Sequence, residues 1–85
     1  MLQTMGLTAE IDVDALPRDR RDVLIRQRLA QTRPGDAVRL TSAADLHPVW
    51  RRQHACNHNS HIWVYEECGP VRWRVRVTRR SLDDY

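Results

Sequence analysis

Four histidines and a cysteine lie within one short stretch of the chain, and their side chains are the ones that transition metals prefer. The stretch begins at His47, and its densest part holds His54, Cys56, His58 and His61. On a flexible loop, these spacings would allow the side chains to converge on one zinc, copper or nickel ion. The spacing matches no standard zinc module, however. A polar loop with scattered histidines is therefore the preferred interpretation, and metal binding is an alternative.

The same residues offer little for catalysis. Cys56 beside His54 or His58 could act as a nucleophile and a base, but neighbours in sequence rarely hold that geometry. No oxyanion hole or third orienting group is visible in the sequence. Asp12 and Asp14 lie two residues apart, but without a metal partner they do not form a catalytic pair. We therefore expect no catalytic residues, and an enzyme is the least favoured function.

A second pattern places arginines at alternate positions near the end of the chain. Arg72, Arg74 and Arg76 are separated by apolar residues, which predicts a strand with one basic face. A basic stripe can follow phosphate groups, so nucleic-acid binding through an arginine-rich sheet face is a second alternative. Alternating arginines also keep an exposed sheet face soluble, and we prefer this interpretation.

Length and composition limit the classes of protein that the chain can represent. A sequence of 85 residues with 41% hydrophobic and 29% charged residues is typical of one small folded domain. A domain of this size has one thin core and no deep interior cleft. No apolar run is long enough to span a membrane, and the N-terminus does not resemble a signal peptide. We expect a cytoplasmic protein without a membrane partner, and the sequence does not indicate its oligomeric state.

Periodicity predicts six elements that would position these residues. In order, they are a strand over residues 10–14, a helix over 18–32, a strand over 36–41, a helix over 48–55 and strands over 61–66 and 71–78. Right-handed crossovers would place both helices on one side. The predicted fold is α/β (α+β): a two-layer sandwich of order β-α-β-α-β-β, with two helices on one face of a four-stranded mixed sheet.

The predicted domain spans residues 9–80, with a loose N-terminal arm over 1–8 and a C-terminal tail over 81–85. A hairpin turn over residues 67–70 would join the last two strands. The favoured register puts Glu66 opposite Arg72 and turns Trp63 and Tyr65 toward the helices. A register shifted by one residue would turn both aromatic side chains outward.

Several short motifs occur in a characteristic order along the chain. They are Ile11-Asp12-Val13, Leu16-Pro17, Arg21 with Ile25, Pro34-Gly35, Pro48, Gly69-Pro70 and Trp73-Arg74-Val75-Arg76-Val77. With the predicted order of elements, they resemble the SirA/TusA-like superfamily, and within it an uncharacterised bacterial domain family related to TusA. No single motif is specific, but their order and spacing together extend the resemblance over about residues 10–79.

The sequence departs from the resembled families in two places. TusA-type sulfur carriers have a Cys-Pro-x-Pro motif where the first helix begins, because the helix N-terminus activates the thiol. Here the corresponding stretch is Pro17-Arg18-Asp19-Arg20, so the sequence does not support persulfide carriage. The nearer relatives tend to have His-Asp-Pro-x-Pro before the second helix. Ala44-Asp45-Leu46-His47-Pro48 keeps only the aspartate and the second proline, and His47 could replace the missing histidine from a shifted position.

We therefore expect a small, non-catalytic binding or regulatory module that docks a protein partner and needs no cofactor. The resemblance implies a redox-related setting. The residues predicted to bind the partner are Leu16, Pro17, Arg18, Arg20 and Arg21 at the start of the first helix, with His47 and Pro48 at the start of the second.

Overall fold

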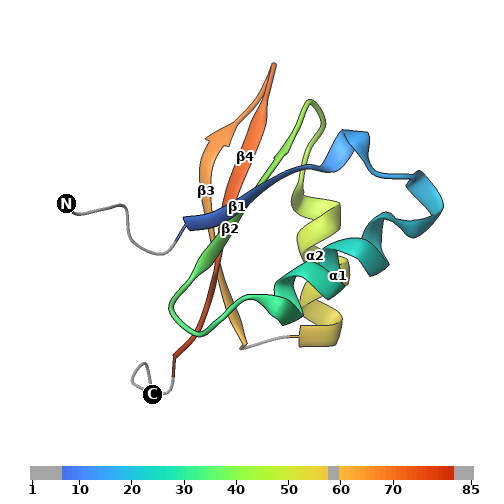
Figure 1. Ribbon diagram of the computed structural model, residues 1–85. Coiled ribbons are helices and arrows are strands. Elements are labelled where there is room, and N and C mark those ends of the chain that lie inside the picture. The colour runs from blue at the N-terminus through green and yellow to red at the C-terminus, as the bar shows by residue number, and fades with distance from the viewer. Residues whose placement is uncertain (1–6, 58–59, 82–85) are drawn as a thin grey trace.

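The computed structural model describes residues 7–57 and 60–81, and its main elements follow the predicted order β-α-β-α-β-β (Figure 1). The strands are β1 (Leu7–Asp12), β2 (Ala37–Ser42), β3 (His61–Cys68) and β4 (Trp73–Arg79). The helices are α1 (Arg21–Gln31) and α2 (His47–Asn57). Two short 3₁₀ turns, η1 (Val13–Ala15) and η2 (Arg18–Arg20), connect β1 to α1.

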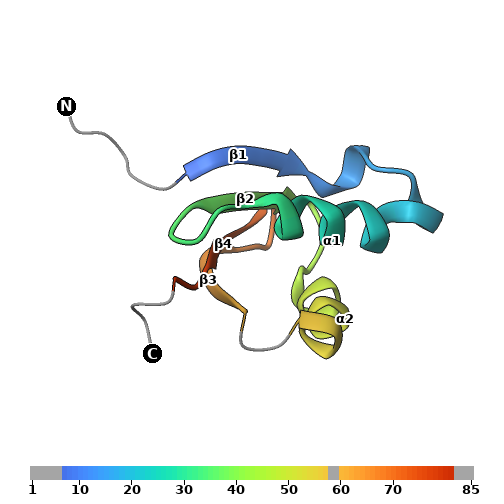
Figure 2. The ribbon, with the colours of Figure 1, turned by 60° about the horizontal axis from the view of Figure 1, so that its bottom comes forward.

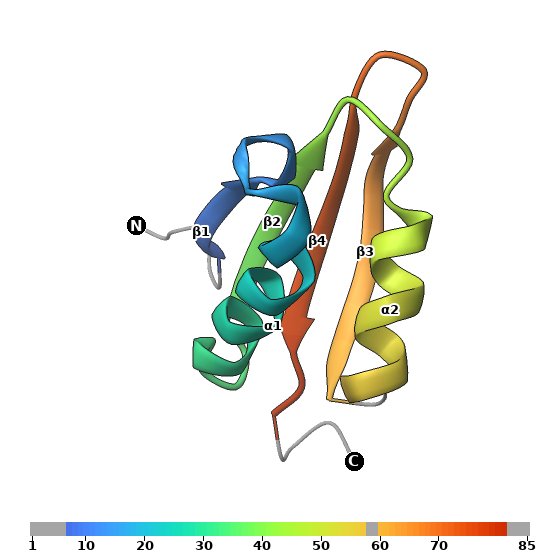
Figure 3. The same ribbon diagram turned by 90° about the vertical axis from the view of Figure 1, so that its right-hand side faces the viewer.

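The four strands form one mixed sheet in the order β1-β2-β4-β3. β1 and β2 are parallel, whereas β4 is antiparallel to both of its neighbours. Both helices lie on the same side of the sheet (Figures 1 and 2). Seen from that side, α1 lies over the half of the sheet that holds β1 and β2, and α2 lies beside β3 (Figure 3). The predicted two-layer sandwich is confirmed.

The core lies between the sheet and the helices. Its buried side chains are Val13, Ile25, Leu29, Val38, Leu40, Leu46, Val49, Val75 and Val77. Those of β2 and β4 occupy alternate positions because successive residues of a strand face opposite sides of the sheet. Trp63, Tyr65 and Trp73 pack against the edge of this core.

The first strand ends two residues earlier than the predicted range of 10–14. The backbone N–H of Asp14 donates to Asp12 Oδ1 over 3.1 Å, and this bond caps the turn η1. Helix α1 is likewise shorter than the predicted 18–32. The N–H of Arg20 bonds to the carbonyl of Pro17, so the segment that precedes α1 is a 3₁₀ turn. Both predictions missed local hydrogen bonds that turn the chain before α1 begins.

The hairpin confirms one part of the predicted register and corrects another. Trp63 and Tyr65 face the helices, as predicted. Glu66 does not lie opposite Arg72, because the pairing shifts between Tyr65 and Glu67. This bulge leaves the Glu66 carboxylate free to bond to arginines of β2 and β4 instead.

Among the described residues, no helix combines the length and the apolar character that crossing a membrane would require.

Truncating a side chain is expected to lower the free energy of unfolding more on the covered face of the sheet than on the uncovered face. Leu40 is fully buried under the helices, whereas Val64 on the opposite face is 50% exposed. We expect Leu40→Ala to lower the free energy of unfolding by about 2–5 kcal/mol because it leaves a cavity. Val64→Ala is expected to cost less than about 1 kcal/mol. Urea unfolding measures both, and equal losses would contradict the assignment of the covered face.

Candidate functional site

Three strands of the sheet end on the same side of the molecule. β1 and β2 are parallel, and β2 and β3 are both antiparallel to β4, so all three run in one direction. Their carboxyl ends are followed by η1 and η2, by residues 43–46 and by the hairpin turn 69–72. Figure 1 shows η1 and these two turns at the top of the molecule. We call this region the carboxyl end of the sheet, and open α/β sheets commonly bind ligands there.

The first predicted docking segment, Leu16–Arg21, is named here the helix entrance. The Arg21 guanidinium donates from Nη2 to the carbonyl of Leu16 over 3.1 Å, which holds the segment against the start of α1. Arg18 and Arg20 are exposed, and neither forms an ion pair with a carboxylate of residues 7–57 or 60–81. The helix entrance thus presents guanidinium groups whose donors are available to another molecule.

Two contacts of Asp22 fix the second helix beside the first. Its carboxylate pairs with Arg52, and its backbone carbonyl accepts a hydrogen bond from Gln53 Nε2 over 2.9 Å. Gln53 is almost completely buried, so this bond lies between the helices and away from solvent. It joins the start of α1 to the middle of α2.

The second predicted docking segment is held by an aspartate and two aromatic rings. Asp45 Oδ1 accepts the backbone N–H of His47 at 2.8 Å and lies 2.7 Å from the ring nitrogen Nδ1. These bonds lower the pKa of the Asp45 carboxyl. The imidazole stacks on Tyr65 at a centroid distance of 4.7 Å and meets Trp73 edge-on at 5.6 Å. His47 is therefore held in place although half of its side chain is exposed.

Sequence reasoning identified His47 and Pro48 but missed the aromatic residues beneath them. Burial raises the pKa of Tyr65, and its buried hydroxyl has no hydrogen-bond partner within the described part of the chain. Only the predicted inward orientation of Tyr65 hinted at this arrangement. The stacking itself depends on where α2 begins relative to β3.

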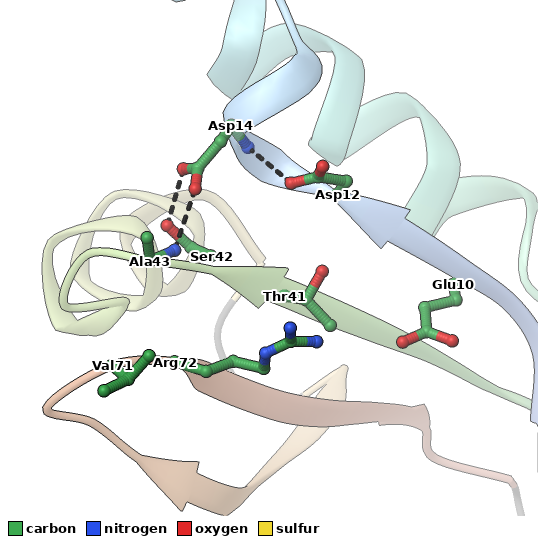
Figure 4. A pocket seen from close by; sticks show the side chains of 8 residues that line it. All are labelled: Glu10, Asp12, Asp14, Thr41, Ser42, Ala43, Val71 and Arg72. Carbon is green, nitrogen blue, oxygen red and sulfur yellow. Dashed lines mark hydrogen bonds between the residues drawn. The ribbon is translucent and has the colours of Figure 1, made fainter.

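A polar pocket of about 410 Å³ opens at the same end, on the sheet face that no helix covers (Figure 4). Its lining residues are Glu10, Asp12, Asp14, Thr41, Ser42, Ala43, Val71 and Arg72. The Arg72 side chain reaches over Thr41 toward Glu10 without an ion pair to any described carboxylate.

Asp14 joins the segment after β1 to the end of β2. Its carboxylate accepts a hydrogen bond from the Ser42 hydroxyl at 2.6 Å and another from the Ala43 backbone N–H at 2.8 Å. The hydroxyl bond, followed by the backbone bond, lowers the pKa of Asp14. This carboxylate thus joins η1 to the end of β2.

Glutamates accompany two of the three arginines on which the nucleic-acid alternative rests. Arg76 Nε lies 3.2 Å from a Glu66 oxygen, and Arg74 Nε lies 3.5 Å from a Glu67 oxygen. Arg39 donates to the other Glu66 oxygen at 2.7 Å, which lowers the pKa of that carboxyl. These pairs reduce the positive potential of the uncovered face. Nucleic-acid binding through Arg72, Arg74 and Arg76 stays an untested prediction.

The His/Cys loop of the metal-binding alternative is described only in part. His58 and the side chain of Cys56 lie outside the described residues. His54 stacks on Trp50 at 4.9 Å. His61 Nε2 lies 3.2 Å from the carbonyl of Leu29, and its Nδ1 lies 2.9 Å from the hydroxyl of Ser60.

Both nitrogens of His61 are thus engaged within the fold. Residues 7–57 and 60–81 contain no group of three or more side chains placed to hold a metal ion, as far as their side chains are described. Metal binding by the loop stays a prediction, and His61 would have to give up at least one of its bonds to take part in it.

Comparison with known proteins identifies the family. A protein-family model described as "Uncharacterized conserved protein (DUF2249)" matches residues 10–79. The chain belongs to this family. A search of the curated proteins finds no match. Among solved structures, this DUF2249 chain is similar to the one described as "Solution structure of HP1264 from Helicobacter pylori". The TM-score is 0.65 at 9% identity, over 85% of this chain and 97% of that one, which shows a shared fold.

The bonds to Asp14 predict a stability difference that depends on pH. We expect Asp14→Ala to lower the free energy of unfolding by about 1 kcal/mol at neutral pH. Because its pKa is lowered in the folded protein, the stabilisation is present above the ordinary aspartate pKa and is lost as the pH falls through the folded value. Urea unfolding near pH 7 and near pH 3 measures the difference. Asp19→Ala, at an exposed position in η2, is the control.

His61 predicts a second pH effect at the opposite end of the sheet. Burial lowers the pKa of His61, so the folded protein favours the neutral ring. As the pH falls below about 6.5, the unfolded chain takes up the proton first and the free energy of unfolding decreases. We expect His61→Gln to remove this part of the pH dependence, and His54→Gln to leave it in place. An unchanged pH profile in His61→Gln would contradict the burial of the ring.

Proposed function

We propose that this chain is a non-catalytic docking module that binds an acidic surface of a partner protein through its helix side. The observation that carries the proposal is a set of arginines on η2, α1 and α2 without ion pairs to described carboxylates: Arg18, Arg20, Arg28 and Arg51. All four are exposed. Guanidinium groups bind carboxylates through two parallel hydrogen bonds, which makes acidic side chains their natural partners.

The carboxyl end of the sheet supports the proposal through its rigidity. His47 is held by Asp45 and by the stacked ring of Tyr65, and Arg21 holds the helix entrance by its bond to Leu16. A surface that is already ordered loses less conformational entropy when a partner binds. The fixed helix entrance and His47 with Pro48 would therefore supply the specific part of the contact, and the remaining arginines would add attraction over a longer range.

A relationship to the SirA/TusA-like superfamily is part of the proposal. It is supported by the motif order between Ile11 and Val77 and by the arrangement of two helices on one face of a mixed sheet. In this view, Pro17-Arg18-Asp19-Arg20 occupies the place of the carrier cysteine and has become a contact surface. The redox-related setting and the cytoplasmic location rest on the sequence resemblance and composition alone.

Charge reversal at the helix entrance tests the proposal. We expect the double variant Arg18→Glu/Arg20→Glu to lose more than about tenfold of its binding, because each guanidinium would supply charge-assisted hydrogen bonds. The measurement is quantitative co-purification of the tagged chain with proteins of a native lysate. Arg33→Glu makes one such charge reversal beyond the far end of α1 and is the control.

Three results would contradict the docking proposal. The first is partner recovery that does not change in the double variant. The second is an equal loss in Arg33→Glu, which would show a response to net charge only. The third is recovery of the free chain alone from gentle lysates. Thermal unfolding of each variant separates lost binding from lost folding.

A further inference from the structure

Strand β1 has one edge that no described strand covers. Within the described sheet, its only neighbour is β2. The backbone N–H and C=O groups along an open strand edge can accept an added strand from another chain. β1 carries acidic residues, which is one way in which proteins prevent unspecific pairing at such an edge.

A groove lined by three apolar and three polar residues runs beside this open edge. It has a volume of about 300 Å³ and is lined by Ile11, Leu16, Leu24, Gln27, Arg28 and Gln31. None of these residues belongs to β2, β3 or β4. The groove therefore lies between β1 and α1, at the edge of β1 that no described strand covers. The spacing of Leu24, Gln27, Arg28 and Gln31 places them on one stripe of α1 that overhangs this side. A strand added to β1 would turn every second side chain into the groove.

The opposite face of β1 carries two carboxylates, with Arg72 in the same pocket and Arg39 opposite Glu10 on β2. Glu10 and Asp12 both line the polar pocket on the uncovered side of the sheet (Figure 4). Neither forms an ion pair with a cation of the described residues. The side chains that an added strand presents on this face would lie beside these carboxylates, where lysine or arginine is favoured and glutamate or aspartate is not.

We propose that β1 accepts an extended segment of a partner protein in which apolar residues alternate with lysine or arginine. The apolar residues fill the groove formed by Ile11, Leu16 and Leu24, and the basic residues face Glu10 and Asp12. The groove shares Leu16 and Arg28 with the proposed docking surface, but Arg18 and Arg20 do not line it. Strand addition at β1 therefore does not require the docking proposed for Arg18 and Arg20.

The charges of β1 argue against a second copy of the chain as the occupant. Antiparallel pairing of two β1 strands across a two-fold axis would bring Glu10 and Asp12 of one copy close to those of the other. Like charges on neighbouring strands destabilise the pairing. A segment with the opposite charge has no such penalty.

Capped peptides of defined sequence test the proposal with the full chain. The probe alternates valine and lysine, and the controls alternate valine with glutamate, replace valine by serine, or keep the valine–lysine composition in two blocks. Fluorescence anisotropy measures affinity, and NMR amide exchange locates the binding. We expect the valine–lysine peptide to bind about tenfold more tightly than each control and to slow the exchange of β1 amides.

Charge reversal on β1 supplies the decisive variant. We expect Glu10→Lys to lose the preference for the valine–lysine peptide and to gain binding of the valine–glutamate peptide. Asp19→Lys makes the same change at the helix entrance and is expected to keep the original preference. Arg18→Glu/Arg20→Glu is expected to keep it as well, which separates this proposal from the docking function.

Several results would overturn the proposal that β1 accepts an added strand. One is equal affinity for all four peptides, and another is an unchanged preference in Glu10→Lys. Slower exchange on β3 with none on β1 would place the added strand at the wrong edge. A concentration-dependent dimer that protects β1 and excludes the peptide would instead make a second copy the occupant.

Discussion

The parallel pairing of β1 with β2 is the constraint on which the rest of the structure depends. Each of these strands is followed by a helix on the same face of the sheet, so both helices begin beyond the same carboxyl end. β4 runs antiparallel between β2 and β3, which brings the hairpin turn to that end as well. Segments that are distant in the sequence therefore meet there, and the helix entrance and His47 share one end of a small domain.

Among the described residues, ion pairs engage several arginines on one side of the molecule and leave others unpaired on the opposite side. On the uncovered sheet face, Glu66 bonds to Arg39 and Arg76, so two guanidinium groups share one carboxylate. On the helix side, Arg18 and Arg20 have no such pairs with described carboxylates. Arg18 and Arg20 thus remain available, whereas Arg39 and Arg76 are engaged with Glu66. This difference favours the helix side as the place where an acidic partner would bind.

The two layers could be predicted from periodicity. The alternation of apolar and polar residues in β4 and the apolar stripe of α1 are both visible among residues that are neighbours in the sequence. Contacts between distant residues could not be predicted in this way. Glu66 leaves the regular register for Arg39, which lies 27 residues earlier, and Asp14 bonds to Ser42 across 28 residues. The sequence marked His47 as a candidate, but its stacking on a tyrosine of β3 requires the folded arrangement.

Hydrogen–deuterium exchange on the chain isolated with its partner tests most directly whether the carboxyl end of the sheet is the binding region. Compared with the chain alone, the account predicts slower exchange in the helix entrance and at the start of α2. It predicts no change at the opposite end, in residues 32–36 between α1 and β2. Slower exchange confined to residues 32–36, with the helix entrance unchanged, would contradict the account.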